Sequence, residues 1–129
     1  MSAANFLGVS NIKGMLTIKK IEIIIRPEKL EEVKEILNSL QVHGMTVVRV
    51  SGYGQQKGRK EIYSGKEVSQ NLLPKVMVQT VVHDHMVDEI MKNVSSAVRT
   101  GQIGDGKIFI YNVEEVFRIR TSESGDDAI

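Results

Sequence analysis

The sequence feature that most constrains the fold is a strand–helix–strand pattern that occurs twice. Four β-branched or apolar runs typical of strands stand at Lys20–Ile25, Thr46–Val50, Val76–Val82 and Lys107–Tyr111. One amphipathic helical pattern lies between the first two runs and another between the last two. This order predicts an α+β fold of the ferredoxin-like βαββαβ type, in which both helices pack on one face of an antiparallel sheet.

The two helical patterns have recognisable starts. The first follows Pro27, a favoured first helical residue, and repeats apolar residues from Leu30 to Leu40 at spacings of three and four. The second has the same spacing up to Val98, and Asp84 is expected to be its N-cap. Each helix therefore has one apolar face that can be buried against the sheet.

The remaining segments divide the chain into parts. Residues 1–17 have no periodicity and are predicted to be a flexible N-terminal extension ahead of one domain at 18–129. Within that domain, about 54–72 is expected to be a long flexible loop, because patternless segments of this length are usually functional or disordered. The C-terminal segment, about 113–129, contains an expected short extended piece at 117–120.

Composition limits the classes of function. The chain has 129 residues, a formal net charge of +1 and no cysteine, which excludes disulfides, thiolate metal sites and thiol catalysis. Near-neutral charge gives no support to a nucleic-acid partner. No apolar run approaches the roughly 18 residues that a membrane span needs, and no signal peptide is recognisable. We therefore expect a cytoplasmic protein without direct membrane insertion.

The strongest local signal for a ligand is the turn Gly104-Asp105-Gly106-Lys107. Glycines let backbone N–H groups converge on an anion, and the lysine adds a positive charge. Ile108 stands where a P-loop has Ser or Thr, and the turn leads from a helix into a strand, so the pattern opposes P-loop hydrolysis. Phosphate binding and a simple glycine-rich turn both remain open from this motif.

A second signal is a pair of arginines near the C-terminus. Arg118 and Arg120 alternate with Phe117 and Ile119, so on a strand both guanidinium groups would lie on one face. Two such groups suit phosphate oxygens. The alternative is a solvated charged face.

No catalytic set of nucleophile, base and orienting residue is recognisable, so we do not expect an enzyme. His83 and His85 are two residues apart at a helix start, and they are expected to face solvent rather than to hold a metal. Gly52-Tyr53-Gly54 does not complete a dinucleotide-binding motif and lacks the helix that should follow it.

Taken together, these segments resemble the PII signal-transduction proteins, the nitrogen regulatory family, from about Ile18 to Ile129. The most specific match is Thr100-Gly-Gln-Ile-Gly-Asp-Gly-Lys-Ile-Phe-Ile110. Further matches in the same order along the chain are Gly44–Val47, Gly52–Gly58, Leu73–Val76, Arg118–Thr121 and the acidic end of the chain.

The resemblance implies a homotrimer that binds ATP or ADP in the clefts between subunits, where the glycine turn and the arginines converge on one triphosphate. The residues that it assigns to the nucleotide are Thr46, Gly54, Gln55, Gln56, Val81, Gly104, Asp105, Gly106, Lys107, Arg118 and Arg120. It also implies 2-oxoglutarate as an effector, bound by Gln56, Lys57, Gly58 and Lys75. Gln56 would ligate a Mg²⁺ ion that the ATP phosphates also coordinate, which suits the preference of Mg²⁺ for oxygen ligands.

The implied mechanism is ligand-dependent order of the 54–72 loop, which then fits different partners. Expected partners are an ammonium transporter or a nitrogen-metabolism enzyme or regulator. Val68 stands where many relatives carry a uridylylated Tyr, so no modification is expected there. Lys66 replaces the Ser that is phosphorylated in other relatives, whereas modification of Tyr63, Ser64 or Ser69 stays open. Gln55 replaces a common Arg beside the phosphates.

Three alternatives accompany this interpretation. The protein could sense adenylate energy charge without responding to 2-oxoglutarate. It could be an RNA-binding domain, because RNA-recognition motifs share the βαββαβ order, although the aromatic content of 5% is low for that function. A nucleotide-hydrolysing enzyme is disfavoured because neither a base nor a metal-ligating hydroxyl is evident.

Overall fold

The fold was obtained from a computed structural model that describes residues 18–53, 60–63, 66–69 and 72–129. The predicted extension at 1–17 and the predicted site residues Gly54, Gln55, Gln56, Lys57 and Gly58 lie outside the described residues. What the sequence predicts for these residues therefore stays a prediction.

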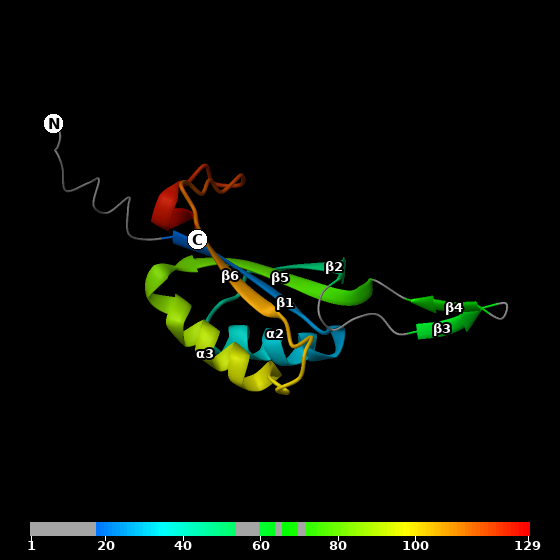
Figure 1. The fold of residues 1–129 in the computed structure, drawn as a ribbon. Helices are drawn as coiled ribbons and strands as arrows, with labels where there is room; N and C mark the ends of the chain where they lie inside the picture. Colours follow the sequence, from blue (N-terminus) through cyan, green and yellow to red (C-terminus); the bar gives the residue numbers. More distant parts are fainter. Residues whose placement is uncertain (1–17, 54–59, 64–65, 70–71) are drawn as a thin grey trace.

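The body of the molecule is a four-stranded antiparallel sheet (Figure 1). Its strands lie in the order β2-β5-β1-β6, which places the first strand in the middle of the sheet. The strands are β1 (Ile18–Ile25), β2 (Thr46–Gly52), β5 (Leu73–His83) and β6 (Lys107–Asn112). The ferredoxin-like α+β prediction is confirmed, and each observed strand is longer than its predicted run.

Two helices pack side by side on one face of this sheet (Figure 1). They are α2 (Leu30–Ser39), which follows a 3₁₀ turn at Pro27–Lys29, and α3 (Val87–Val98), which follows one at Asp84–Met86. The prediction of Asp84 as the N-cap of α3 was wrong, because the chain enters the helix through this 3₁₀ turn and Asp84 is its first residue. No helix in the described part of the chain is long and apolar enough to cross a membrane.

The core lies between the sheet and the helices. Alternate residues of β1 and β5 point to the helices, as the period of two in a strand requires. The fully buried side chains are Ile21, Ile23, Ile25, Val33, Leu37, Val76, Val78, Ile90 and Val94. Each contributes roughly 1.5–3 kcal/mol by leaving water, so this layer holds the central strands β1 and β5 against the two helices.

The opposite face of the sheet has a polar centre on Glu22. Its carboxylate accepts hydrogen bonds from Gln79 Nε2 at 3.0 Å and from the Tyr111 hydroxyl at 3.2 Å. The hydrogen bond to Glu22, with partial burial, raises the pKa of Tyr111. Lys20 Nζ lies 5.5 Å from the centroid of the Tyr111 ring. This face therefore carries side chains that hold one another in fixed positions.

The prediction of a patternless loop at about 54–72 was partly wrong. Within it, β3 (Lys60–Tyr63) and β4 (Lys66–Ser69) pair as a two-stranded antiparallel sheet that projects away from the body (Figure 1). A weak signal was present in the sequence, because two short segments that contain β-favouring residues, Ile62 and Tyr63 in one and Val68 in the other, flank the two-residue connection Ser64-Gly65.

The extended piece predicted at 117–120 is a turn instead. Phe117 makes a single bridge to Ser124, and residues 119–121 form the turn between them. Ser122 has a φ of 61°, and its N–H donates to the Arg118 carbonyl at 2.8 Å, which closes the turn. The C-terminal segment then ends in a 3₁₀ turn at Gly125–Ala128.

Candidate functional site

The described site residues fall into two groups at different ends of the sheet. The first group contains the connection from α3 to β6 at residues 99–106, which we call the glycine turn. Lys107 follows this turn, and two cations from other elements, Arg26 and Lys75, contact it. We call the second group the tail cavity, an open cavity beside the C-terminal segment. Thr46, Val81 and Arg118 line the tail cavity, and Gly104, Asp105, Gly106 and Lys107 belong to the first group.

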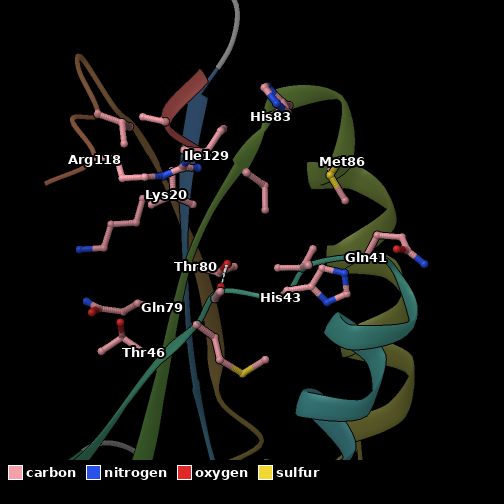
Figure 2. Close-up of a pocket in the computed structure, with 17 residues that line it drawn as sticks. Lys20, Gln41, His43, Thr46, Gln79, Thr80, His83, Met86, Arg118 and Ile129 are labelled. Atoms are coloured by element: carbon pink, nitrogen blue, oxygen red, sulfur yellow. Dashed lines mark hydrogen bonds between the residues drawn. The ribbon is translucent and has the colours of Figure 1, made fainter. Parts of the chain in front are cut away.

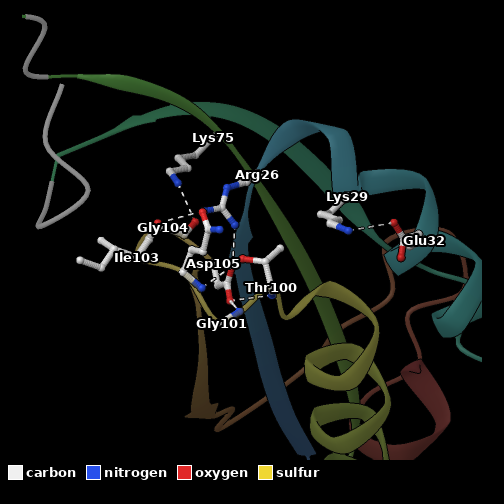
Figure 3. A network of polar contacts seen from close by, with 10 residues as sticks. Arg26, Lys29, Glu32, Lys75, Thr100, Gly101, Ile103, Gly104 and Asp105 are labelled. Carbon is white, nitrogen blue, oxygen red and sulfur yellow. Dashed lines mark hydrogen bonds and ion pairs between the residues drawn. The ribbon is translucent and has the colours of Figure 1, made fainter. Parts of the chain in front are cut away.

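Asp105 organises the glycine turn from within (Figure 3). Its carboxylate accepts hydrogen bonds from the backbone N–H groups of Thr100 at 2.8 Å and Gly101 at 2.9 Å, and from the Thr100 hydroxyl. The hydrogen bond from the Thr100 hydroxyl has the largest effect on the pKa of Asp105, followed by a bond from the Arg26 guanidinium. Together they hold this pKa well below its usual range. The carboxylate is therefore ionised and bonded to its own chain at neutral pH.

Two cations from other elements contact this turn. Arg26, at the end of β1, bonds the Asp105 carboxylate through Nη1 and the Ile103 carbonyl through Nη2, the latter at 2.9 Å. Lys75 on β5 donates from Nζ to the Gly104 carbonyl at 2.9 Å. Partial burial and the neighbouring Arg26 charge lower the pKa of Lys75. Sequence reasoning missed Arg26, although a charged residue directly after a buried strand was a usable signal.

The backbone of the turn depends on glycine at one position above all. Gly106 has a φ of +112°, and a Cβ there would lie 1.9 Å from the Ile24 carbonyl oxygen. Gly101 has a φ of +86°, but a Cβ there would meet nothing within 4 Å. The turn therefore packs directly against β1, and Lys107 follows it opposite Ile24 in the sheet.

The tail cavity has a volume of about 990 Å³ and is open to solvent (Figure 2). Thr46 comes from β2, Val81 from β5 and Arg118 from the C-terminal segment, so three predicted nucleotide residues that are distant in sequence share one cavity. Apolar side chains such as Met45 and Met86 stand beside polar ones such as Gln79. A mixed lining of this kind suits a flat base with polar edges.

The two arginines do not share a strand face, so that sequence prediction was wrong. Arg120 lies in the turn at 119–121, because the chain reverses there instead of continuing as a strand. Arg118 Nη1 donates to Glu123 Oε1 at 2.9 Å, and the Thr121 hydroxyl donates to the same oxygen at 2.7 Å. In the chain as described, the arginine of the tail cavity is held by a neighbouring carboxylate.

The strand register separates the two groups. Lys107 lies opposite Ile24, whereas Val81 lies opposite Lys20, four residues along β1. At about 3.3 Å per residue this is roughly 13 Å along the strand direction. Within one chain, the backbone positions of the glycine turn and of Val81 are therefore offset along the sheet.

The two histidines considered for a metal lie beside each other. The rings of His83 and His85 are stacked with centroids 5.8 Å apart, and His83 Nδ1 lies 3.8 Å from Asp126 Oδ1. Among the residues that the structure describes, no group of three His, Asp or Glu side chains is arranged to hold a metal ion. Gln56, the predicted Mg²⁺ ligand, is not one of those residues.

Comparison with known proteins gives a consistent result. The family model described as Nitrogen regulatory protein P-II matches residues 18–123. The chain is 49% identical over 112 residues to the nitrogen regulatory protein P-II of Rhodospirillum rubrum, and 51% identical over 112 residues to that of Rhizobium meliloti. Each alignment covers 87% of this chain and 100% of the relative.

Among solved structures, the chain is similar to the crystal structure of Arabidopsis thaliana PII bound to citrate. The TM-score is 0.71 at 32% sequence identity, and the match covers 88% of this chain and 94% of the Arabidopsis chain.

Proposed function

The chain belongs to the nitrogen regulatory protein P-II family, whose members act in signal transduction that regulates nitrogen metabolism, and from this premise we propose that it does so by binding ATP or ADP. The nucleotide site lies between neighbouring chains of a homotrimer. One chain supplies its glycine turn and its neighbour supplies its tail cavity. The protein acts as a regulator of other proteins and not as an enzyme.

The observation that carries this proposal is the division of the site within one chain. Thr46, Val81 and Arg118 meet in one cavity, while Lys107 and its turn lie about four residues further along β1. A head-to-tail contact between identical chains brings unlike surfaces together, and it forms a ring when the rotation between neighbours closes. Such a contact would place the tail cavity of one chain beside the glycine turn of the next.

Each half has a separate task in nucleotide binding. The tail cavity takes the adenine base, with the Thr46 side chain and the Val81 backbone at its edge. The glycine turn takes the phosphates through its backbone N–H groups and Lys107, because these are the groups that stabilise anions. Arg118 leaves Glu123 and bonds the phosphates, with Arg120 beside it.

The second ligand is 2-oxoglutarate, bound at Lys75 together with Gln56, Lys57 and Gly58. Lys75 already lies against the glycine turn, which favours a carboxylate site next to the phosphates. The Arabidopsis relative binds citrate, which is also a small carboxylate. Magnesium, when bound to Gln56 and the ATP phosphates, would supply the charge that links the two ligands.

The response is transmitted through the segment at about 54–72, which includes the projecting pair β3 and β4. The ligands select among arrangements of this segment, and each arrangement fits a different target. The targets are an ammonium transporter or an enzyme or regulator of nitrogen metabolism in the cytoplasm. Val68 has no hydroxyl, so this regulation proceeds without uridylylation at that position.

Isothermal titration calorimetry tests the proposal. ATP and ADP should each bind the full chain, and 2-oxoglutarate should bind only when ATP and Mg²⁺ are present. Lys75→Ala should abolish the 2-oxoglutarate signal, while ADP should still bind with reduced affinity because Lys75 also bonds the Gly104 carbonyl. ATP binding without any response to 2-oxoglutarate would instead favour an adenylate-energy sensor, and no binding of either nucleotide would contradict the proposal.

A further inference from the structure

The glycine turn contains a carboxylate where the proposed ligand is an anion. Asp105 lies between Gly104 and Gly106, the glycines whose backbone is proposed to hold phosphates. An ionised carboxylate at this place would repel a triphosphate, because charges of like sign a few ångströms apart disfavour each other by several kcal/mol at low effective dielectric. The proposed site therefore needs a group that neutralises Asp105 and orients its oxygens.

Arg26 is placed to meet both needs. Its guanidinium is mostly buried, with 15% of its side chain exposed, and it reaches the turn from the end of β1, 79 residues away in sequence. Nη1 bonds the carboxylate of Asp105, and Nη2 bonds the Ile103 carbonyl at 2.9 Å (Figure 3). One planar group thus contacts the turn at two residues.

The hydrogen bonds of Asp105 fix the orientation of its carboxylate oxygens. Its oxygens accept bonds from the start of the turn at Thr100 and Gly101 and from Arg26. Lys75 bonds the Gly104 carbonyl, so the carbonyl oxygens of Ile103 and Gly104 both point toward cations. Carbonyl oxygens directed toward Arg26 and Lys75 are kept away from an incoming phosphate.

We propose that Arg26 is a positioning residue for phosphate recognition, which compensates the Asp105 charge and holds the Ile103 carbonyl so that the glycine turn can accept an anion. This inference rests on the proposed nucleotide function and assigns a role to a residue that the resemblance does not include. Arg26 acts through the turn, and Lys107 and the backbone N–H groups contact the phosphates.

The shape of the guanidinium matters as much as its charge. A lysine at position 26 would keep the positive charge, but a single ammonium group does not reproduce the planar fork that reaches a carboxylate and a carbonyl together. Arg26→Lys should therefore lose part of the affinity for ATP. Arg26→Met keeps a side chain of similar length without charge and should lose more.

The test is a double-mutant cycle on ATP affinity, using Arg26→Met, Asp105→Asn and the double variant of the full chain. Removal of one partner of a hydrogen-bonded charge pair leaves the other charge uncompensated, so Arg26→Met should raise the ATP Kd about 10- to 100-fold. The double variant also lacks the carboxylate charge. It should therefore bind ATP about 3- to 10-fold more tightly than the single variant Arg26→Met does.

Lys29→Met is the matched control. Lys29 makes an ion pair with Glu32 at 3.4 Å in the next turn of the chain, also drawn in Figure 3, and this pair does not contact the glycine turn. Its removal should change the ATP Kd by less than about 2-fold, because this partly exposed pair lies outside the glycine turn. Thermal unfolding of each variant is measured in parallel. Should Arg26→Met fail to fold, Arg26→Gln takes its place in the cycle.

The outcomes separate this inference from the proposed function. Absence of ATP binding by the unmodified chain contradicts the proposed function itself. Normal ATP binding together with an unchanged Kd in Arg26→Met overturns the role of Arg26. The role of Arg26 is also overturned if the double variant binds ATP no better than Arg26→Met. If Arg26 only stabilised the turn, the loss of the Asp105 carboxylate as well would not restore affinity for ATP.

Discussion

The glycine turn and the tail cavity are built in opposite ways. The glycine turn is held by bonds within the chain, because Asp105 accepts from Thr100 and Gly101 and two cations contact the same turn. The tail cavity is wide and open, and its arginine is bonded to Glu123. In the proposed site, the glycine turn is therefore preformed, whereas the tail cavity must release Arg118 from Glu123 before Arg118 can bind phosphate.

This difference predicts that the two halves of the proposed site contribute differently to the free energy of nucleotide binding. A preformed group loses little conformational freedom when a ligand arrives, so the glycine turn should bind phosphate at low entropic cost. The tail segment leaves Phe117 and Ile119 exposed, with Ile119 90% accessible, as expected for a surface that a neighbouring chain covers. Substitutions at the two ends should accordingly have different effects on stability and on affinity.

The largest effect is expected at Gly106. In Gly106→Ala the new Cβ would overlap the Ile24 carbonyl oxygen and the φ of +112° would be strained, so the free energy of unfolding should fall by at least about 3 kcal/mol. Gly101→Ala is the control, because its Cβ has space and only the φ cost of about 1–2 kcal/mol applies. Urea unfolding of both variants measures this. Equal losses would contradict the close packing of the turn against β1.

At the other end, Arg118→Gln should affect affinity rather than stability. Loss of a charge-assisted bond to phosphate should raise the ATP Kd about 10- to 100-fold. The melting temperature should stay within about 2 °C, because the Arg118–Glu123 pair is partly exposed. Calorimetry and a thermal scan report the two quantities. A variant that unfolds readily would show that the tail is as rigid as the glycine turn.

A smaller effect concerns pH and the glycine turn alone. The pKa of Asp105 in the folded chain is lower than its ordinary value near 4, so ionised Asp105 stabilises the fold above that value. This stabilisation should be lost progressively as the pH falls from about 4 toward the lowered pKa. In Asp105→Asn the fall in stability between pH 5 and pH 2 should be shallower than in the unmodified chain. Urea unfolding at several pH values tests this, and parallel curves would contradict it.

The smallest expected change is a gain in affinity at the tail cavity. Glu123→Gln removes the carboxylate that holds Arg118, so the guanidinium needs no release before it meets phosphate. Exposed ion pairs contribute about 0–1 kcal/mol, so the ATP Kd should fall about 2- to 5-fold. Glu115→Gln, in the same segment but without a bond to Arg118, is the control. Weaker ATP binding by Glu123→Gln would contradict competition between Glu123 and the phosphates.

The core elements were predictable because they follow from periodicity. The β-branched run at Lys20–Ile25 predicted a strand, and the apolar spacing up to Val98 predicted a helix with one buried face; both predictions were confirmed. The turn at 119–121 was missed, because alternating arginines at Arg118 and Arg120 favour a strand until the backbone bonds of Ser122 are known. The β3–β4 pair was missed because each strand has only four residues and begins with two charged residues, so neither shows a period of two.

The site was less accessible to sequence reasoning than the fold. The glycine motif is local, and its anion-binding character follows from residue types alone. Thr46, Val81 and Arg118 were assigned through family resemblance, and the structure places them in one cavity. Arg26 follows a buried strand, which marked it as unusual, but its partner Asp105 is 79 positions away in sequence, so the contact itself could not be predicted.

The most direct test of the shared site mixes two inactive variants. Lys107→Ala removes the phosphate cation of the glycine turn, and Arg118→Ala removes that of the tail cavity, so neither variant alone should bind ATP tightly. When equal amounts are unfolded together and refolded, random assembly should restore roughly a quarter of the ATP sites, because one type of neighbouring pair has both intact halves. Calorimetry that finds no tight sites in the mixture would contradict a site shared between chains.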